Sequence, residues 1–191
     1  GFNAGSALAA DGNAGMAMVV THISAATASL VWMLMDWSRF GKPTLIGLVT
    51  GTIAGLASIT PASGSVGPIG ALIIGASAGI ICYLFVNIVK NNLKIDDSLD
   101  VFAVHGVGGL LGIILVAFLV DANIGGAGYA DGINAISQLM IQLKGTVAVL
   151  VLSVVATIVI TYVVKLTVGL RVDDSSEVEG LDISSHGETN G

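Results

Sequence analysis

The sequence predicts an all-α protein that crosses a membrane several times, with about five full transmembrane helices plus the end of a sixth. Hydrophobic residues make up 54% of the chain, charged residues make up 10%, and the mean hydropathy is +0.91. In soluble domains, about a quarter of the residues are charged. The apolar residues also gather into uninterrupted segments of membrane length. These observations place the chain among multi-pass membrane proteins.

Five apolar segments approach or exceed the length needed to cross a bilayer. A span needs about 20 residues at a rise of roughly 1.5 Å each. The second segment is the shortest, with about 15 apolar or small residues, although Ile59, Thr60 and Pro61 could lengthen it. Short polar or glycine-rich breaks separate the segments. We predict spans at residues 14–35, 44–58, 66–89, 99–120 and 140–166.

The first ten residues, GFNAGSALAA, are typical of the last part of an apolar helix. Ten residues rise about 15 Å, which is half of what a span requires. They carry neither the charged segment nor the cleavage site of a signal peptide. We therefore expect an upstream half of the protein to precede this sequence. Within the sequence itself, we expect a transmembrane domain at residues 1–170 and a cytoplasmic tail at residues 171–191.

Lysine and arginine are distributed unevenly between the breaks, and this predicts the orientation. Cytoplasmic loops are enriched in both residue types. The other side of the predicted bundle has only Lys144, so six of the seven cations agree with one topology. That topology places the tail in the cytoplasm and Phe2 near the outer face. The cations on the cytoplasmic side are Arg39, Lys42, Lys90, Lys94, Lys165 and Arg171.

Much of the negative charge of the chain lies in its C-terminal segment. The formal net charge is −6, but six of the thirteen acidic residues lie between Asp173 and Glu188. The global charge therefore says little about partners, and we expect no nucleic acid among them. A short acidic segment rich in Gly and Ser is expected to be disordered by itself.

His105 is the most informative residue. It lies in DDSLDVFAVHGVGG, residues 96–109, inside the fourth predicted span. An ionisable side chain at hydrocarbon depth is costly unless it faces a protein interior or a water-accessible path. The residue therefore indicates a permeation or proton route, with Gly106 removing side-chain bulk beside the imidazole. The alternative is an interior histidine that holds one helix to another.

Other residues in the spans favour structural roles. Glycines at every fourth position, in GLVTGTIAG and GASAG, predict close helix crossings. Thr21 and Ser24 beside His22 predict a hydrogen-bond cluster between helices. The aromatic residues expected at the membrane interface or against lipid are Trp32, Trp37 and Tyr83.

The sequence has no Walker loop, GxGxxG motif or metal-spaced group of Cys and His residues. We therefore expect no nucleotide chemistry, no cofactor and no bound metal. An intramembrane enzyme that used His105 with Asp100 would lack a nucleophile or a second acid, so we expect a protein that is not an enzyme. Asp100 itself fits both capping of the fourth span and a place at the inner mouth of a pore.

Four separated motifs resemble the second half of the ammonium transporter family, in its Amt branch. They are GFNAGSALAA at the start, ITPASG at 59–64, DDSLDVFAVHGVGG at 96–109 and GLDISSHGE at 180–188. They occur in the correct order, and the resemblance covers the whole chain. It implies half of an eleven-helix fold with two inverted repeats, a pore in each subunit of a homotrimer, and nitrogen uptake across the cell membrane.

The resemblance implies roles for individual residues. His105 resembles the second of the family's two pore histidines, Phe2 the inner phenylalanine of its gate, and Ser6 the hydroxyl of its external ammonium-recruiting site. The partner histidine, the other gate phenylalanine and the recruiting tryptophan are expected in the upstream half. The residues expected to support the pore lining are Thr60, Asp100 and Gly106.

The resemblance also implies two functional alternatives. In the first, ammonium gives up a proton and crosses as ammonia through a hydrophobic pore, while a buried imidazole relays the proton. In the second, a sensor of the same family reports ammonium to cytoplasmic partners. The tail is implied to fold against neighbouring subunits and to communicate with PII-type signalling proteins. The remaining expected partners are ammonium or ammonia and the lipid bilayer.

Overall fold

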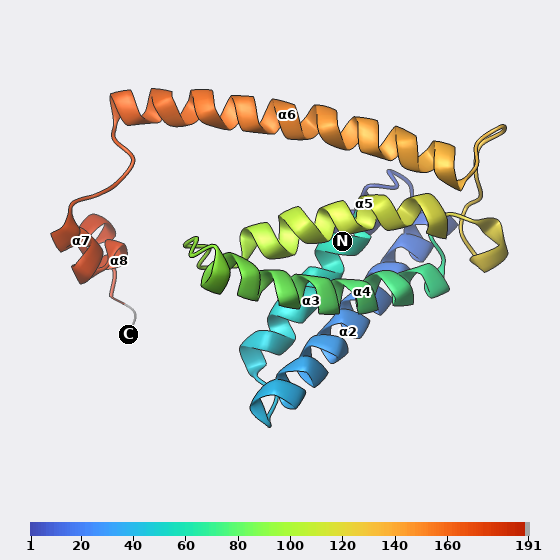
Figure 1. Cartoon of the computed structure of the whole chain (residues 1–191), viewed down its shortest axis with the longest axis horizontal. Helices are drawn as coiled ribbons and strands as arrows, with labels where there is room; N and C mark the ends of the chain where they lie inside the picture. Colours follow the sequence, from blue (N-terminus) through green and yellow to red (C-terminus); the bar gives the residue numbers. More distant parts are fainter. Residues whose placement is uncertain (190–191) are drawn as a thin grey trace. The chain divides into compact units, whose positions relative to one another are not determined.

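The computed structural model describes residues 1–189, which divide after Lys144 into two compact units. In the first unit, four helices form a bundle of two antiparallel pairs, α2 with α3 and α4 with α5 (Figure 1). The helices of this unit are α1 (Phe2–Gly5), α2 (Gly12–Phe40), α3 (Leu45–Ile59), α4 (Pro68–Asn87) and α5 (Gly108–Leu119), while α6 (Ala135–Thr167) begins here and continues into the second unit.

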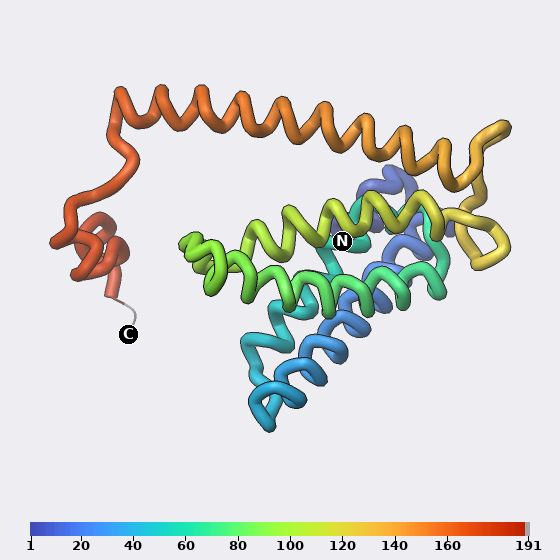
Figure 2. Tube along the Cα trace, viewed as in Figure 1, coloured from blue at the N-terminus to red at the C-terminus, as the bar shows by residue number. Residues whose placement is uncertain are grey.

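Two π-helical turns lie where α4 doubles back into α5 (Figure 2). Ile88–Asn92, the Lys90 turn, extends the end of α4. Phe102–Val107, the His105 turn, leads into α5 without a break. π-helical turns are rare and frequently occur at functional sites. A short 3-10 helix, Ala122–Ile124, follows α5.

Four helical segments of the described chain are long and apolar enough to cross a membrane: Gly12–Phe40, Pro68–Asn92, Phe102–Leu119 and Ala135–Thr167. With 15 residues, α3 is shorter than a typical span. It ends at Ile59, since the proline two residues later lacks the amide needed to continue the helix. The predicted class, an all-α multi-pass membrane protein, is confirmed. The five expected helices correspond to α2 to α6, and the expected helix end corresponds to α1.

Local hydrogen bonds fix the ends of α2 and α3. Asp11 caps α2 by accepting hydrogen bonds from two amides of its first turn, at 2.9 and 3.1 Å. The helix stops at Gly41, whose φ of 74° favours glycine. Thr44 caps α3 and donates a 2.6 Å hydrogen bond to the buried carboxylate of Asp36. These contacts hold the tight connection between the two helices.

Glycines let the backbone of α3 approach α2 closely. A Cβ added at Gly51 would lie 2.6 Å from the Trp32 Cβ, and one added at Gly55 would lie 2.8 Å from the Ala25 Cα. Both distances are too short for real Cβ atoms, so only glycine fits. The Ser24 hydroxyl on α2 donates a 2.9 Å hydrogen bond to the carbonyl of Gly55. The prediction that the repeated glycines make helix contacts is confirmed.

Trp32 and Tyr83 lie in the core, which corrects the sequence prediction. Trp32 is 5% exposed and Tyr83 is 6% exposed, and their rings meet edge to face with centroids 5.2 Å apart. Such pairs are favourable beyond the area that they bury. The expectation of a lipid or interface position was wrong for these two residues because each ring is covered by the other's helix. Trp37, in contrast, is 53% exposed.

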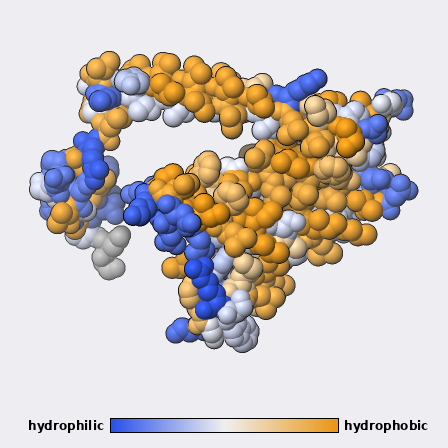
Figure 3. Space-filling model, in the orientation of Figure 1, coloured by the Kyte–Doolittle hydropathy of each residue, from blue (hydrophilic) through white to orange (hydrophobic). Residues whose placement is uncertain are grey.

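Apolar side chains also cover the outside of the helices (Figure 3). In the first unit, Leu30, Ile46 and Leu72 are among many large hydrophobic residues that are half exposed or more. Soluble monomers rarely expose contiguous apolar surface on this scale. Hydrocarbon solvates such a surface at little cost, so the exposed residues agree with a membrane location.

The second unit contains the end of α6 and two short helices, α7 (Asp174–Glu179) and α8 (Leu181–His186). Asp173 caps α7 and accepts a 2.6 Å hydrogen bond from the Ser175 hydroxyl. Arg171 forms a two-point ion pair with Glu177, with N to O distances of 2.6 and 2.7 Å. These local contacts explain helical order where composition by itself predicted disorder. The predicted boundary between a transmembrane domain and a tail at residue 170 stays a prediction.

Replacing Gly55 with alanine is expected to lower the free energy of unfolding by about 1–3 kcal/mol, because the added methyl group would collide with the α2 backbone. Gly15 on α2 provides the matched control, since a Cβ there meets nothing within 4 Å. Gly15→Ala should leave stability unchanged or raise it by up to about 1 kcal/mol. Thermal unfolding of the full-length protein in detergent measures both. Equal stability of the two variants would contradict the packing assigned to α3.

The tail helix α7 is expected to lose its cap in acid. The Ser175 hydroxyl, and then the Ser176 amide, lower the pKa of Asp173 to about 2, and Arg171 lowers the pKa of Glu177. A carboxylate with a depressed folded pKa stabilises the fold above its unfolded pKa and stops doing so as the pH falls through the folded value. We therefore expect α7 to weaken progressively between about pH 4 and about pH 2, as measured by NMR amide shifts of the tail in the full-length protein.

A pair of serine variants controls this titration. Ser175→Ala should raise the midpoint of Asp173, because it removes the largest contribution to the lowered pKa. Ser185→Ala, in α8, should leave the midpoint unchanged. A midpoint near the ordinary value of 3.8 in the unmodified protein would show that Asp173 does not cap α7 in solution.

Candidate functional site

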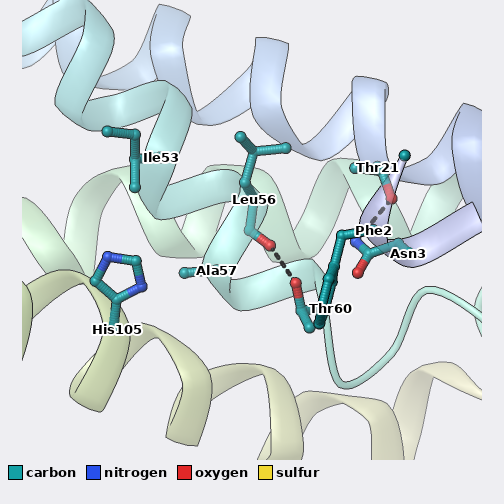
Figure 4. Close-up of a pocket in the computed structure, with 9 residues that line it drawn as sticks. Phe2, Asn3, Thr21, Ile53, Leu56, Ala57, Thr60 and His105 are labelled. Carbon is teal, nitrogen blue, oxygen red and sulfur yellow. Dashed lines mark hydrogen bonds between the residues drawn. The ribbon is translucent and has the colours of Figure 1, made fainter. Parts of the chain in front are cut away.

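A cavity of about 530 Å³ lies in the first unit and is bordered by α1, α2, α3 and the His105 turn. Figure 4 shows His105 near one end of this cavity and Phe2, Asn3 and Thr21 near the other. Most of the wall is apolar, with a few polar side chains among the apolar ones. Small-molecule sites commonly combine an apolar lining with a small number of placed polar groups.

The long wall of the cavity is one face of α3. Ile53, Leu56, Ala57 and Thr60 follow one another at spacings of three, one and three residues, which places them on the same side of a helix. Glycines on another face of α3 pack against α2. This packing sets the rotation of α3 about its axis and so presents these four residues to the cavity.

Hydrogen bonds within the bundle engage three polar residues of the lining, Asn3, Thr21 and Thr60. The Asn3 amide nitrogen donates to the Thr21 hydroxyl at 3.0 Å and joins α1 to α2. The Thr21 hydroxyl donates to the Ala17 carbonyl at 2.6 Å, and the Thr60 hydroxyl donates to the Leu56 carbonyl at 2.8 Å. Each hydroxyl donates its hydrogen to its own helix, and one lone pair of Thr21 accepts from Asn3, so the other lone pair of Thr21 and those of Thr60 remain as acceptors. The arrangement can accept hydrogen bonds from a small N–H donor.

The His105 imidazole points from its turn toward the α3 wall (Figure 4). Ala103 and Val104, the two residues before it, are 0% and 2% exposed, so burial fixes which side of the turn faces the bundle. Within residues 1–189, the imidazole has no hydrogen-bond partner. The alternative of a histidine that holds two helices together therefore has no hydrogen bond to support it. Neither ring nitrogen is engaged by another residue of the described chain, so one can donate and the other can accept a hydrogen bond.

Three of the predicted site residues line the cavity, and three do not. Those that line it are Phe2, Thr60 and His105. Ser6 lies one turn after Phe2, and its hydroxyl donates a 2.9 Å hydrogen bond to the Phe2 carbonyl. Its exposed position fits no role inside the cavity itself. The recruiting role that the resemblance implies for Ser6 stays a prediction.

Gly106 and Asp100 also lie outside the lining. A Cβ at Gly106 would meet the Phe102 ring at 3.4 Å, and the three nearest atoms all belong to that ring of its own turn. The Asp100 carboxylate forms an ion pair with Lys90 at 2.7 Å. Asp97, and not Asp100 as expected, caps this helix. Its carboxylate accepts hydrogen bonds from two free amides at the start of the His105 turn, at 2.9 Å each. Sequence alone could not tell which of these clustered aspartates reaches the helix end.

Sequence reasoning missed Asn3 and Thr21 as cavity residues. Thr21 was expected to form a cluster with His22 and Ser24. Thr21 and Ser24 do bond neighbouring helices, α1 and α3, as expected, but the His22 ring bonds the Met18 carbonyl of its own helix at 2.9 Å. The sequence held one signal for Asn3, which directly follows Phe2, the candidate gate residue, in GFNAG. It held no comparable signal for Thr21, because its contact with Asn3 joins two different helices.

Comparison with known proteins identifies the family. The model of the Ammonium Transporter Family matches residues 1–191. An ammonium transporter of Aquifex aeolicus is 46% identical over 98% of this chain and 44% of its own length. The ammonium transporter Amt1 of Archaeoglobus fulgidus is 45% identical over 98% of this chain and 47% of its own length. The chain thus spans about half the length of the curated relatives that it matches.

Solved structures share the arrangement of helices. A structure titled Sensor Amt Protein matches with a TM-score of 0.85 and 30% identity, over 96% of this chain and 45% of that one. Mep2 of Saccharomyces cerevisiae matches with a TM-score of 0.76 and 36% identity, over 87% of this chain and 41% of that one. Because the family model covers the chain from end to end, the chain belongs to the ammonium transporter family.

Proposed function

We propose that the full-length protein moves ammonium or ammonia across the cell membrane, and that the cavity beside His105 is part of the pathway. The observation that carries this proposal is an ionisable ring on a membrane helix that faces an apolar cavity and holds no other helix. Family membership and the names of the relatives support ammonium as the substrate. Because those relatives are named as transporters, they also favour a protein that is not an enzyme.

The lining suits a small cation that must lose its water. Stripping water from ammonium in an apolar passage is expensive unless other contacts replace it. The Phe2 ring face offers cation–π attraction, and Asn3 and Thr21 at the same end of the cavity offer acceptor oxygens. Ser6, one turn away, would add a hydroxyl at the entrance. The apolar wall beyond these groups disfavours any ion that keeps its charge.

His105 would allow the pathway to select ammonium over other cations of similar size. Potassium has no proton to give, whereas ammonium can cross as neutral ammonia if its proton moves separately. A neutral imidazole accepts a proton at one nitrogen and can donate one from the other. In this proposal His105 accepts or relays that proton, while Thr60, Asp100 and Gly106 support the lining around it.

A second candidate function is ammonium sensing. The match to a structure titled Sensor Amt Protein favours it, because a sensor can share the whole fold of a transporter. A sensor would bind ammonium and signal without carrying a comparable flux. Uptake of ammonium into liposomes that contain the full-length protein, compared with binding to the same protein in detergent, separates the two functions.

The assembly and regulation follow from family membership as further proposals. The full-length protein would form a homotrimer, with one pathway in each subunit. Its tail, which contains α7 and α8, would contact other cytoplasmic segments or a PII-type signalling protein. The helical order of the tail supports a defined binding surface, since residues 174–179 and 181–186 are already helical.

His105→Ala in the full-length protein should lower the electrogenic ammonium current by about a hundredfold or more, since positioned acid–base groups contribute about 10²–10⁴-fold. His22→Ala is the control, because the His22 ring bonds only within its own helix and should leave the current unchanged. Proteoliposomes on a solid-supported membrane measure the current, with potassium as the reference ion. An unchanged current in His105→Ala, with potassium still excluded, would contradict the proton role.

Removal of residues 180–191 from the full-length protein should change the transport rate or its response to a PII-type regulator. The physical reason is that this segment contains α8, which would form part of the cytoplasmic contact surface. Ammonium uptake is measured with and without the regulator, for the intact and shortened proteins. Identical rates in all four measurements would refute a regulatory role for the tail.

A further inference from the structure

We infer that the ion pair between Lys90 and Asp100, together with the Asp97 cap, positions His105 in the cavity. This inference rests on the proposed function and deepens it. Lys90 and Asp97 have no place among the residues that line the cavity. They would act through the backbone that carries the imidazole, as positioning residues.

The ion pair joins the two π-helical turns. The Lys90 ammonium on the first turn lies 2.7 Å from the Asp100 carboxylate, just before the second. The Asp100 side chain is 17% exposed and the Lys90 side chain is 37% exposed, so the carboxylate is partly shielded from water while the ammonium stays at the surface. Lys90 also reaches the Ser98 carbonyl at 3.5 Å. The ion pair therefore links the end of α4 to the start of the His105 turn.

The backbone at Asp100 shows that this position is held in place. Its φ of 57° lies in the left-handed region, which few residues other than glycine adopt. Its amide donates to the Asp97 carbonyl at 3.1 Å, and its carbonyl accepts from the Val104 amide at 2.8 Å. An unfavourable backbone conformation persists where surrounding contacts determine it. Here those contacts are the ion pair, the Asp97 cap and the first bonds of the helix.

The other end of the His105 turn is held by packing. A Cβ at Gly108 would lie 2.8 Å from the Ser58 hydroxyl oxygen and 3.2 Å from the Cys82 sulfur. A Cβ at Gly112, one turn later, would collide with the Ser58 carbonyl oxygen. These contacts fix the start of α5 against α3 and α4. The His105 turn thus lies between a packed end and an end held by polar contacts.

The π-helical bonding makes the direction of His105 sensitive to the polar end. A π-helical turn holds more residues than an α-helical turn. If the turn relaxed to α-helical bonding, the hydrogen-bond register would shift by one residue. Each residue before Gly108 would then rotate about the helix axis by up to about 100°. His105 would then leave the α3 wall while α5 stayed in place. The ion pair and the cap oppose this relaxation.

Charge-neutral variants of the full-length protein test the inference. Lys90→Gln and Asp100→Asn should each lower the ammonium current about tenfold or more, since misplacing a reacting group by about 1 Å can cost about a hundredfold. The double variant should be no worse than the poorer single variant, because both changes break one interaction. Lys90→Arg should retain the current. Lys94→Gln, which removes an exposed cation from the same connection, is the matched control and should have no effect.

A second background shows whether the ion pair acts through His105. In a His105→Ala protein, Lys90→Gln should cause no further loss. A further loss of similar size there, or additive losses in the double variant, would overturn the positioning role. An unchanged current in Lys90→Gln, together with a reduced current in His105→Ala, would contradict this inference but leave the proposed function standing. An unchanged current in His105→Ala would remove the proposed function, and the inference with it. If Asp100→Asn fails to fold, Lys90→Gln decides, because Lys90 lies outside the core.

Discussion

The close approach of α3 to its neighbours determines the rest of the first unit. Gly51 and Gly55 leave no room for side chains between α3 and α2, and Gly108 and Gly112 leave none between α5 and α3. In a bilayer, apolar contact with lipid is as good as apolar contact with a helix, so dense backbone packing has to supply the association. With α3 held on two sides, its remaining face becomes the wall of the cavity.

The polar side chains of the first unit differ in whether they have a hydrogen-bond partner. Ser24, Thr21 and Thr60 direct their hydroxyl hydrogens to backbone carbonyls, as polar groups in an apolar surrounding require. The buried hydroxyls of Ser58 and Tyr83 lack a hydrogen-bond partner among residues 1–189, and so does the Asp100 Oδ1 atom, which meets Lys90 as an ion pair only; none of these groups lines the cavity. His105 differs from all of these, because it is exposed and its ring lines the cavity with no hydrogen-bond partner in the part of the chain that the structure describes. That difference is the physical basis for treating it as functional.

Local irregularity and the proposed site coincide in this structure. The His105 turn is π-helical, Asp100 before it adopts a left-handed backbone, and the Lys90 turn opposite is π-helical as well. Regular helix would be the lower-energy choice for such a sequence in lipid, so the departure from it needs compensating contacts. Those contacts lie at the polar end of the bundle, where a lysine and two aspartates can stay partly hydrated.

Much of the fold could be read from residue type and spacing. Composition gave the membrane class, the lengths of the apolar runs gave the helices, and the repeated glycines predicted the crossings of α3. His105 was identifiable because an ionisable residue inside an apolar run is costly wherever the chain places it. The motif resemblance gave the family, and Phe2 and Thr60, which the motifs singled out, line the same cavity as His105. Each of these inferences depends on a property that a single segment carries by itself.

Tertiary structure decided the features that need two distant segments. Trp32 lies in the core because Tyr83 meets it, Thr21 lines the cavity because Asn3 bonds it, and Lys90 pairs with Asp100 across a reversal of the chain. Asp97 takes the cap because the turn before α5 points its carboxylate at two free amides. Periodicity shows which face of a helix is apolar but not which helix covers it, because the partner is chosen by packing of the whole bundle.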